Sequence, residues 1–150
     1  MYNLDELYIG INHLFKKDVE VSVLLDYTSI VYYNVGTEDS VEYDQKFYNR
    51  LYDACGPLAV HTHINTSALP SIYDLTAWCS NEEILTTAIF ALNGSKVDGF
   101  MFEKTNDYTS PSAVFHVWEE YIKDGYSQED AITSTMKELK IYIVDTFKEE

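Results

Sequence analysis

The most informative stretch of the sequence is PLAVHTHINTSALPSIYDL, residues 57–75. Its first seven residues are predicted to form a short buried strand that ends in two histidines, His61 and His63. Because side chains alternate along a strand, both imidazoles point to the same side. After a loop, Ser71 is expected to begin a short helix that carries Asp74 in its first turn. Two imidazoles and one carboxylate are therefore expected at one end of a sheet.

These three side chains suit a catalytic zinc ion. Three protein ligands leave the fourth position for water, and the metal lowers the pKa of that water to about 7. Ordinary alternatives exist, because a histidine in a strand is more often structural, and Ser71-x-x-Asp74 is also a helix capping-box pattern. The combination of the two histidines and the aspartate favours the metal site, since two polar rings at the end of a buried strand are expected to serve a function.

The segments around this stretch alternate between helical and strand patterns. Helices are predicted over residues 3–17, 40–55 and 112–123, and strands over residues 19–25, 29–35, 84–92 and 97–103. A last helix is predicted to start at Ser127, because Asp130 completes a capping-box pattern with it. Its expected apolar stripe consists of Ile132, Met136, Leu139, Ile143 and Phe147. The fold class is therefore expected to be α/β, with a central mixed sheet flanked by helices in one domain over residues 1–150.

Composition and charge narrow the possible functions. Hydrophobic residues make up 46% of the 150 residues, which is typical of a globular protein. The net charge of -15 argues against a nucleic-acid partner, which needs a basic surface. No run of about 18 apolar residues predicts a membrane span, and acids precede lysines in the first 17 residues, unlike a secretory signal. We therefore expect a cytoplasmic protein, with Cys55 and Cys79 as free, buried thiols.

The pattern His-x-His-x10-Asp, with a serine three residues before the aspartate, resembles the signature of the JAMM/MPN zinc metalloproteases. Residues 61–63 and 69–75 match that signature in residue type and spacing, and Trp78 follows as in the family. The order of predicted elements is similar over most of the chain. The sequence departs from the family at Ile64, where a proline is usual, and at Val23 and Tyr27, where glycine is expected.

The resemblance implies a compact MPN-like, cytidine-deaminase-like domain that cleaves isopeptide or peptide bonds. It implies that Zn²⁺ is bound by His61, His63 and Asp74, that Glu20 is the catalytic base, and that Ser71 helps to stabilise the oxyanion. Implied substrates are a ubiquitin-like conjugate or a small peptide. Residues 36–46 and 104–111 are the stretches that have the length to guide such a substrate.

Glu20 also draws attention without the resemblance. Val19, Val21 and Val23 share one face of the predicted strand, so Glu20 points to the other face. A glutamate within an apolar strand costs desolvation free energy unless it has a partner. The alternative is an edge strand that leaves Glu20 in solvent, in which case the base would be Glu38 or Glu42 in the following acidic loop.

Two non-catalytic functions remain open. One is a catalytically silent MPN-type scaffold, although such modules typically lose the ligands that are all present in this sequence. The other is an acidic protein-interaction module whose histidines are structural. The zinc deaminases are a poorer match, because their chemistry uses a His-x-Glu and a Pro-Cys-x-x-Cys motif that the sequence lacks.

Overall fold

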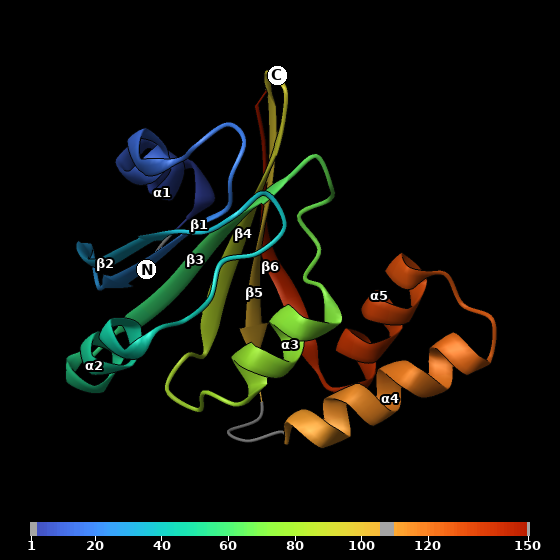
Figure 1. Ribbon diagram of the computed structural model, residues 1–150. Coiled ribbons are helices and arrows are strands. Elements are labelled where there is room, and N and C mark those ends of the chain that lie inside the picture. Colours follow the sequence, from blue (N-terminus) through green and yellow to red (C-terminus); the bar gives the residue numbers. More distant parts are fainter. Residues whose placement is uncertain (1–2, 106–109, 150) are drawn as a thin grey trace.

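The computed structural model describes residues 3–105 and 110–149, and its centre is a six-stranded sheet with helices on both faces (Figure 1). The elements are α1 (Leu4–Ile11), the 3-10 turn η1 (Asn12–Leu14), β1 (Val21–Asp26), β2 (Ser29–Val35), α2 (Gln45–Asp53), β3 (Pro57–Ile64), α3 (Ile72–Cys79), β4 (Thr86–Asn93), β5 (Lys96–Lys104), α4 (Pro111–Lys123), α5 (Gln128–Glu138) and β6 (Ile141–Glu149). The strand order is β2-β1-β3-β4-β5-β6. Only the β3–β4 pair is parallel among these strands, so the predicted mixed sheet is confirmed.

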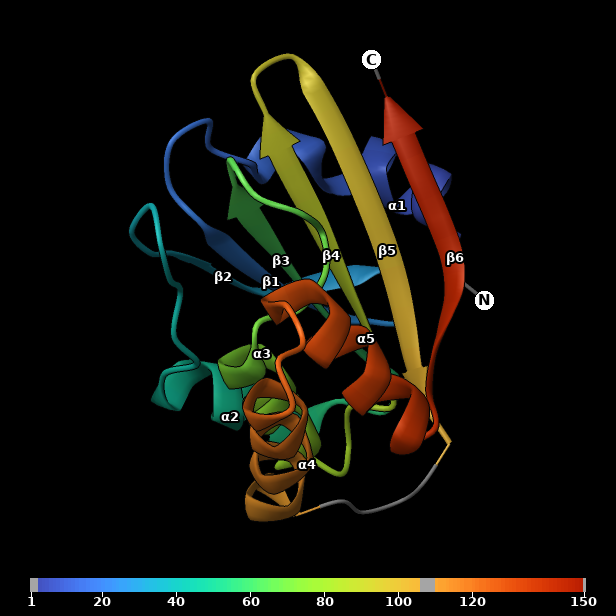
Figure 2. The same cartoon turned by 90° about the vertical axis from the view of Figure 1, so that its right-hand side faces the viewer.

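The two faces of the sheet have separate hydrophobic cores. On one face, α1 packs its buried leucines and Ile11 against residues such as Val23, Val60 and Phe90. The other face carries α2, α3, α4 and α5, with α3 between α2 and α5 (Figure 2). Side chains from β3 alternate between these cores, since Ala59 belongs to the second and Val60 to the first. His61 and His63 therefore project toward the helices α2 to α5.

The pairing of β1 with β3 brings Glu20 to the same place. Ser22 pairs with His61 in this antiparallel ladder, so the register extended by two residues sets Glu20 opposite His63. Backbone hydrogen bonds hold Glu20 there: its amide donates to Thr37 O at 2.6 Å, and the amide of Gly36 donates to its carbonyl at 2.8 Å. A Cβ on Gly36 would lie 2.1 Å from the Ser40 carbonyl oxygen, so this turn requires glycine.

The C-terminal segment differs from the prediction. Helix α5 ends at Glu138, and residues 141–149 form the edge strand β6, which pairs antiparallel with β5. Lys140 has a φ of 59°, a left-handed conformation that ends a helix. The predicted continuous stripe is therefore wrong: Met136 packs in the core under the helices, whereas Phe147 packs on the opposite face beside Tyr8, and Ile143 is 43% exposed. The β-branched residues of IYIVDTF favour a strand.

Several predicted boundaries also move. Helix α2 begins after Asp44, whose side chain accepts a hydrogen bond from the amide of Phe47 and so caps the helix, and residues 36–44 are non-helical. Helix α1 ends at Ile11 instead of residue 17, and Cys55 is exposed rather than buried.

Part of the 104–111 stretch, residues 106–109, lies outside the described residues. Within the described chain, no helix combines the length and apolarity needed to cross a membrane.

Candidate metal centre

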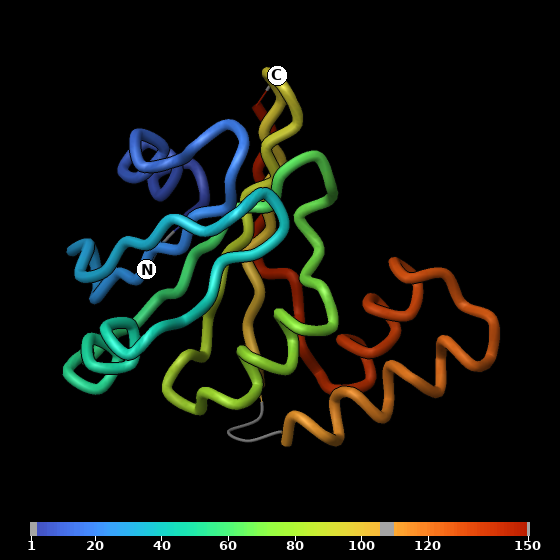
Figure 3. The backbone as a smooth tube through the Cα atoms, viewed as in Figure 1, coloured from blue at the N-terminus to red at the C-terminus, as the bar shows by residue number. Residues whose placement is uncertain are grey.

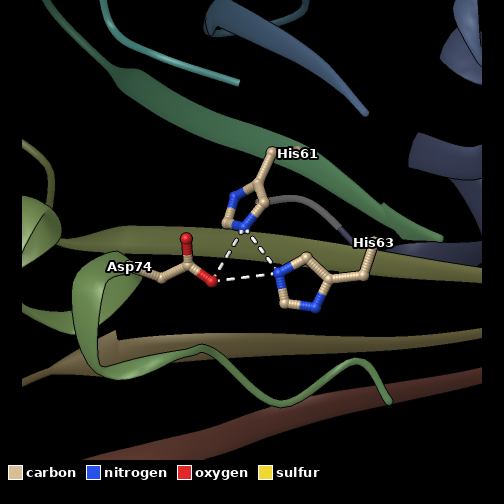
Figure 4. A group of neighbouring side chains, drawn as sticks. All are labelled: His61, His63 and Asp74. Carbon is tan, nitrogen blue, oxygen red and sulfur yellow. Dashed lines mark hydrogen bonds and ion pairs between the residues drawn. The ribbon is translucent and has the colours of Figure 1, made fainter. Parts of the chain in front are cut away.

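His61, His63 and Asp74 converge on one point between β3 and α3. Both histidines lie at the C-terminal end of β3, in the interior of the sheet between β1 and β4. The backbone then turns back through a loop into α3, whose first turn lies near His63 (Figure 3). Asp74 lies in the first turn of this helix and faces both imidazoles (Figure 4). The structure thus brings together the three side chains that the sequence motif singled out.

The distances among these ligand atoms fit one tetrahedral metal ion. The two Nε2 atoms are 3.1 Å apart, and Asp74 Oδ2 lies 2.9 Å from His63 Nε2 and 3.4 Å from His61 Nε2. Ligands at about 2.0–2.1 Å from a tetrahedral zinc are separated by about 3.3–3.4 Å. Each side of the triangle is therefore within about 0.5 Å of that separation. The group can hold a metal ion.

The protonation of His63 gives a second reason to expect a cation at this point. Its Nδ1 lies 2.9 Å from the carbonyl oxygen of Ser67, which only accepts hydrogen bonds, so Nδ1 carries the hydrogen. The lone pair of Nε2 in a neutral imidazole then points at Asp74 Oδ2. Two lone pairs 2.9 Å apart repel unless a proton or a metal cation lies with them. The Ser67 contact is the kind of second hydrogen bond that orients a metal-binding histidine.

Asp74 takes part in a helix capping box as well as in this cluster. The amide of Ser71 donates to Asp74 Oδ2 at 2.9 Å, and the amide of Asp74 donates to Ser71 Oγ at 3.0 Å. The capping-box interpretation and the ligand interpretation of Ser71-x-x-Asp74 therefore hold together. The capping bonds fix the carboxylate in the orientation that faces the imidazoles.

The electrostatics of the cluster favour a carboxylate with a cationic partner. Burial by itself would raise the pKa of Asp74, but the charge of His61 and hydrogen bonds from both imidazoles hold that pKa well below its ordinary value. Burial would lower the pKa of His63, but the hydrogen bond and charge of Asp74 outweigh this and raise it. Asp74 is therefore ionised at neutral pH, and the point that it shares with His63 favours positive charge.

Glu20 is the carboxylate beside this cluster. It is only 7% exposed and lines the same cleft as the two histidines and Asp74. Burial raises its pKa, and the positive charges of His63 and His61 offset part of that rise. A raised pKa suits a carboxyl group that accepts and returns a proton. Glu42 lines the cleft but is exposed, and Glu38 does not line it.

Ser71 lies at the rim of the cleft and is exposed. Its Oγ accepts the hydrogen bond from the Asp74 amide, which leaves the hydroxyl hydrogen free to donate. A donor in this position can stabilise negative charge that develops on a substrate oxygen.

Sequence reasoning missed part of the lining of the cleft. Residues 39–43 form part of one wall, as the predicted role of the 36–46 stretch requires, but the start of α5, including Glu129, also lines the cleft. The N-terminus of α5 is more than 50 residues from Asp74 in sequence, and no local sequence pattern indicates that both line one cleft. Tyr43, Tyr48 and Tyr73 are further lining residues that the motif did not indicate.

Comparison with protein-family models, with curated proteins and with solved structures finds no match for this chain.

Proposed function

We propose that this protein is a zinc-dependent hydrolase of the JAMM type, with an MPN-like fold, that cleaves an isopeptide or peptide bond. The observation that carries the proposal is the convergence of His61 Nε2, His63 Nε2 and Asp74 Oδ2 within 3.4 Å of one another, in a cleft that also contains the buried carboxyl group of Glu20. The spacing of these residues in the sequence is that of the JAMM/MPN signature. Substrates of this class are a ubiquitin-like conjugate or a small peptide.

Each residue has a defined role in this proposal. Bound zinc supplies Lewis acidity, which lowers the pKa of water and polarises a carbonyl group. Glu20 accepts a proton from the attacking water and later delivers a proton to the leaving amine. The Ser71 hydroxyl donates a hydrogen bond to the carbonyl oxygen as negative charge develops on it. Burial restricts the access of bulk water to Glu20 and keeps its pKa raised.

The roles are separated by measuring zinc content and turnover in the same variants. Purified wild type is expected to hold one zinc per chain and to cleave a panel of ubiquitin-like conjugates and isopeptides. Glu20→Gln should keep the zinc and lose at least about 100-fold in turnover, as expected for a lost general base. His61→Ala should lose zinc, whereas His116→Ala, an exposed histidine on α4, should change neither property.

Two results would overturn parts of this assignment. A fully active Glu20→Gln variant would show that another group is the base. Zinc binding without turnover on any of the substrates would favour the catalytically silent MPN-type scaffold. That alternative is less well supported, because His61, His63 and Asp74 lie within reach of one metal ion and the buried Glu20 lines the same cleft.

A further inference from the structure

The cleft around the proposed zinc site has acidic walls. Asp39 and Glu42 line it from the connection between β2 and α2, and Glu129 lines it from the first turn of α5. No lysine or arginine is among the described residues that line it. Its volume of about 780 Å³ is at the large end of the usual range for small-molecule pockets, about 300–1,000 Å³. The cleft therefore has room for a short segment of polypeptide.

These wall charges remain when a divalent metal is bound. Five carboxylates line the cleft, two of them, Glu20 and Asp74, on its floor. With neutral histidines, the carboxylates of Glu20 and Asp74 at most cancel the charge of a 2+ ion. Asp39, Glu42 and Glu129 then leave a charge of -3 on the walls, and all three side chains are exposed. A ligand that enters the cleft therefore meets a negative potential.

Glu20, on the floor of the cleft, has no hydrogen-bond or ion-pair partner among the described side chains of the protein. Glu20 is more than nine-tenths buried, yet its side chain makes no hydrogen bond or ion pair within 3–105 and 110–149. The carboxyl oxygens open to the cleft, where a carboxylate favours a proton donor or a cation beside it. Like the charges on the walls, this carboxylate favours positive charge in the cleft, and in the proposed function the metal ion supplies the first such charge.

Aromatic faces near the acids suit the same ligand. Tyr48 on α2 and Tyr73 on α3 line the cleft and are 42% and 76% exposed. Tyr43 stacks on Phe47, with ring centroids 3.9 Å apart, and so has a fixed orientation beside Glu42. The ring of a tyrosine attracts lysine ammonium and arginine guanidinium groups. Acidic and aromatic groups together recognise basic side chains better than either kind alone.

We propose that this cleft selects a cationic polypeptide segment, with lysine or arginine side chains on either side of the bond at the metal. The location of that bond rests on the proposed hydrolase function, whereas the preference for positive charge rests on the cleft walls alone. Asp39 and Glu42 contact basic side chains on one side of the metal, and Glu129 contacts them on the other. Glutamate-rich segments are excluded by repulsion.

Binding to peptides that differ only in charge tests this proposal. The probes are three peptides of one length and one neutral fluorescent label, with lysine, glutamine or glutamate at the same four positions in a glycine-serine background. Fluorescence anisotropy measures their Kd for the zinc-loaded full chain in 20 mM and 300 mM NaCl. The lysine peptide is expected to bind about tenfold more tightly than the glutamine peptide at low salt, and the difference should shrink at high salt.

Two triple variants separate the cleft from the overall charge. Asp39→Asn/Glu42→Gln/Glu129→Gln neutralises the walls, and Glu6→Gln/Glu103→Gln/Asp124→Asn makes the same charge change at exposed sites outside the cleft. The first variant should reduce the preference for lysine over glutamine to less than about threefold, and the second should preserve it. Circular dichroism spectra check that both variants are folded.

The outcomes distinguish this inference from the proposed function. Equal binding of the lysine and glutamine peptides, or an equal loss of preference in both triple variants, would overturn the inference even if wild type hydrolyses isopeptides. Selective binding of the lysine peptide, lost only in the cleft variant, would support it even if wild type shows no turnover, and would then count against the hydrolase function alone.

Discussion

At the scale of single residues, the backbone and the side chain of Glu20 have different roles. Its amide and carbonyl are both hydrogen-bonded to the turn at residues 36–40, while its carboxyl group faces the cluster of His61, His63 and Asp74. The backbone bonds supply the stability that the side chain does not. The fold can therefore keep the carboxyl group of Glu20 buried with a raised pKa. A raised pKa is a property that suits a general base.

We expect Glu20→Gln to stabilise the metal-free protein at alkaline pH. Burial raises the pKa of Glu20 in the folded state, so the folded protein binds this proton more tightly than the unfolded chain does. Stability is then lost as pH rises through the folded-state pKa, and glutamine removes that loss. With EDTA present, urea unfolding at pH 8 should show a higher free energy for the variant, and the difference should decrease toward pH 4.

The exposed Glu103 on β5 provides the matched control. Glu103→Gln makes the same chemical change at an exposed site and should change the free energy of unfolding by less than about 0.5 kcal/mol. A Glu20→Gln variant that is less stable than wild type at pH 8 would show that the ionised carboxylate has a partner in the folded protein.

The convergence of the three side chains in the candidate metal site could be predicted from sequence because its geometry is local. Strand alternation sets His61 and His63 on one side, and the capping box fixes Asp74 in the first turn of α3. Glu20 followed from the same alternation, although β1 begins one residue after it. Glu129 could not be predicted in this way, because only the packing of α5 against the sheet brings it to the cleft.

At the scale of elements, α3 is fixed at both ends. Its N-terminus is held by the capping box. At its C-terminal end, Lys104 Nζ on β5 donates to the carbonyl of Trp78 in the last turn, at 3.0 Å, and to that of Asn81 just after the helix, at 2.9 Å. The ammonium group also lies 5.0 Å from the centre of the Trp78 ring. A buried lysine thus neutralises the negative end of the helix that carries Asp74.

Lys104→Met is expected to destabilise the protein by about 2–3 kcal/mol, because it removes charged hydrogen bonds and leaves buried carbonyls unsatisfied. Burial lowers the pKa of Lys104, so the unfolded chain binds this proton more tightly and wild-type stability rises with pH through that range. The variant should lack this rise. Lys96→Met, at an exposed lysine of the same strand, should change the free energy of unfolding by less than about 0.5 kcal/mol.

The transition from α5 to β6 depends on Lys140. Its φ of 59° costs a non-glycine residue about 1–2 kcal/mol. Lys140→Gly is therefore expected to raise the free energy of unfolding by about 0.5–1 kcal/mol. Lys137→Gly makes the same substitution within α5 and should lower it by about 0.5–1 kcal/mol. Urea unfolding of both variants measures the effects, and destabilisation by both would contradict the observed helix end.

This transition explains why the C-terminal prediction was wrong. The apolar residues from Ile132 to Phe147 are spaced as in a single helix by coincidence. In the structure, the first of them belong to α5 and the last belong to β6. No glycine or proline marks the boundary, since a lysine occupies the left-handed position. The β-branched composition of residues 141–146 was the available signal, and pairing with β5 decided the outcome. The other strands were located correctly because their patterns end at clear turns.

At the scale of the whole molecule, the charge of -15 is poorly compensated. In the described part of the chain, Lys123 is the only lysine or arginine within 4 Å of a carboxylate, and the side chains of its two partners, Glu119 and Glu120, are 44% and 53% exposed. Such surface pairs contribute little to stability. Repulsion among the acids therefore opposes the compact state.

We expect salt to stabilise the metal-free protein. Raising NaCl from 20 to 300 mM shortens the screening length and should raise the thermal midpoint by a few °C in the presence of EDTA. The outer triple variant with Glu6→Gln, Glu103→Gln and Asp124→Asn should show a smaller rise, because fewer charges remain to be screened. A midpoint that falls with salt would indicate that attractive pairs outweigh repulsion.

Zinc K-edge X-ray absorption spectroscopy reads the ligands of the metal directly. For the full chain loaded with one equivalent of zinc, we predict two imidazole nitrogens at about 2.0–2.1 Å and light oxygen scatterers in the remaining positions. His61→Ala and His63→Ala should each lose one imidazole or all bound zinc. A spectrum with sulfur ligands, or one without paired imidazoles in wild type, would contradict the assignment of His61, His63 and Asp74 as a shared metal site.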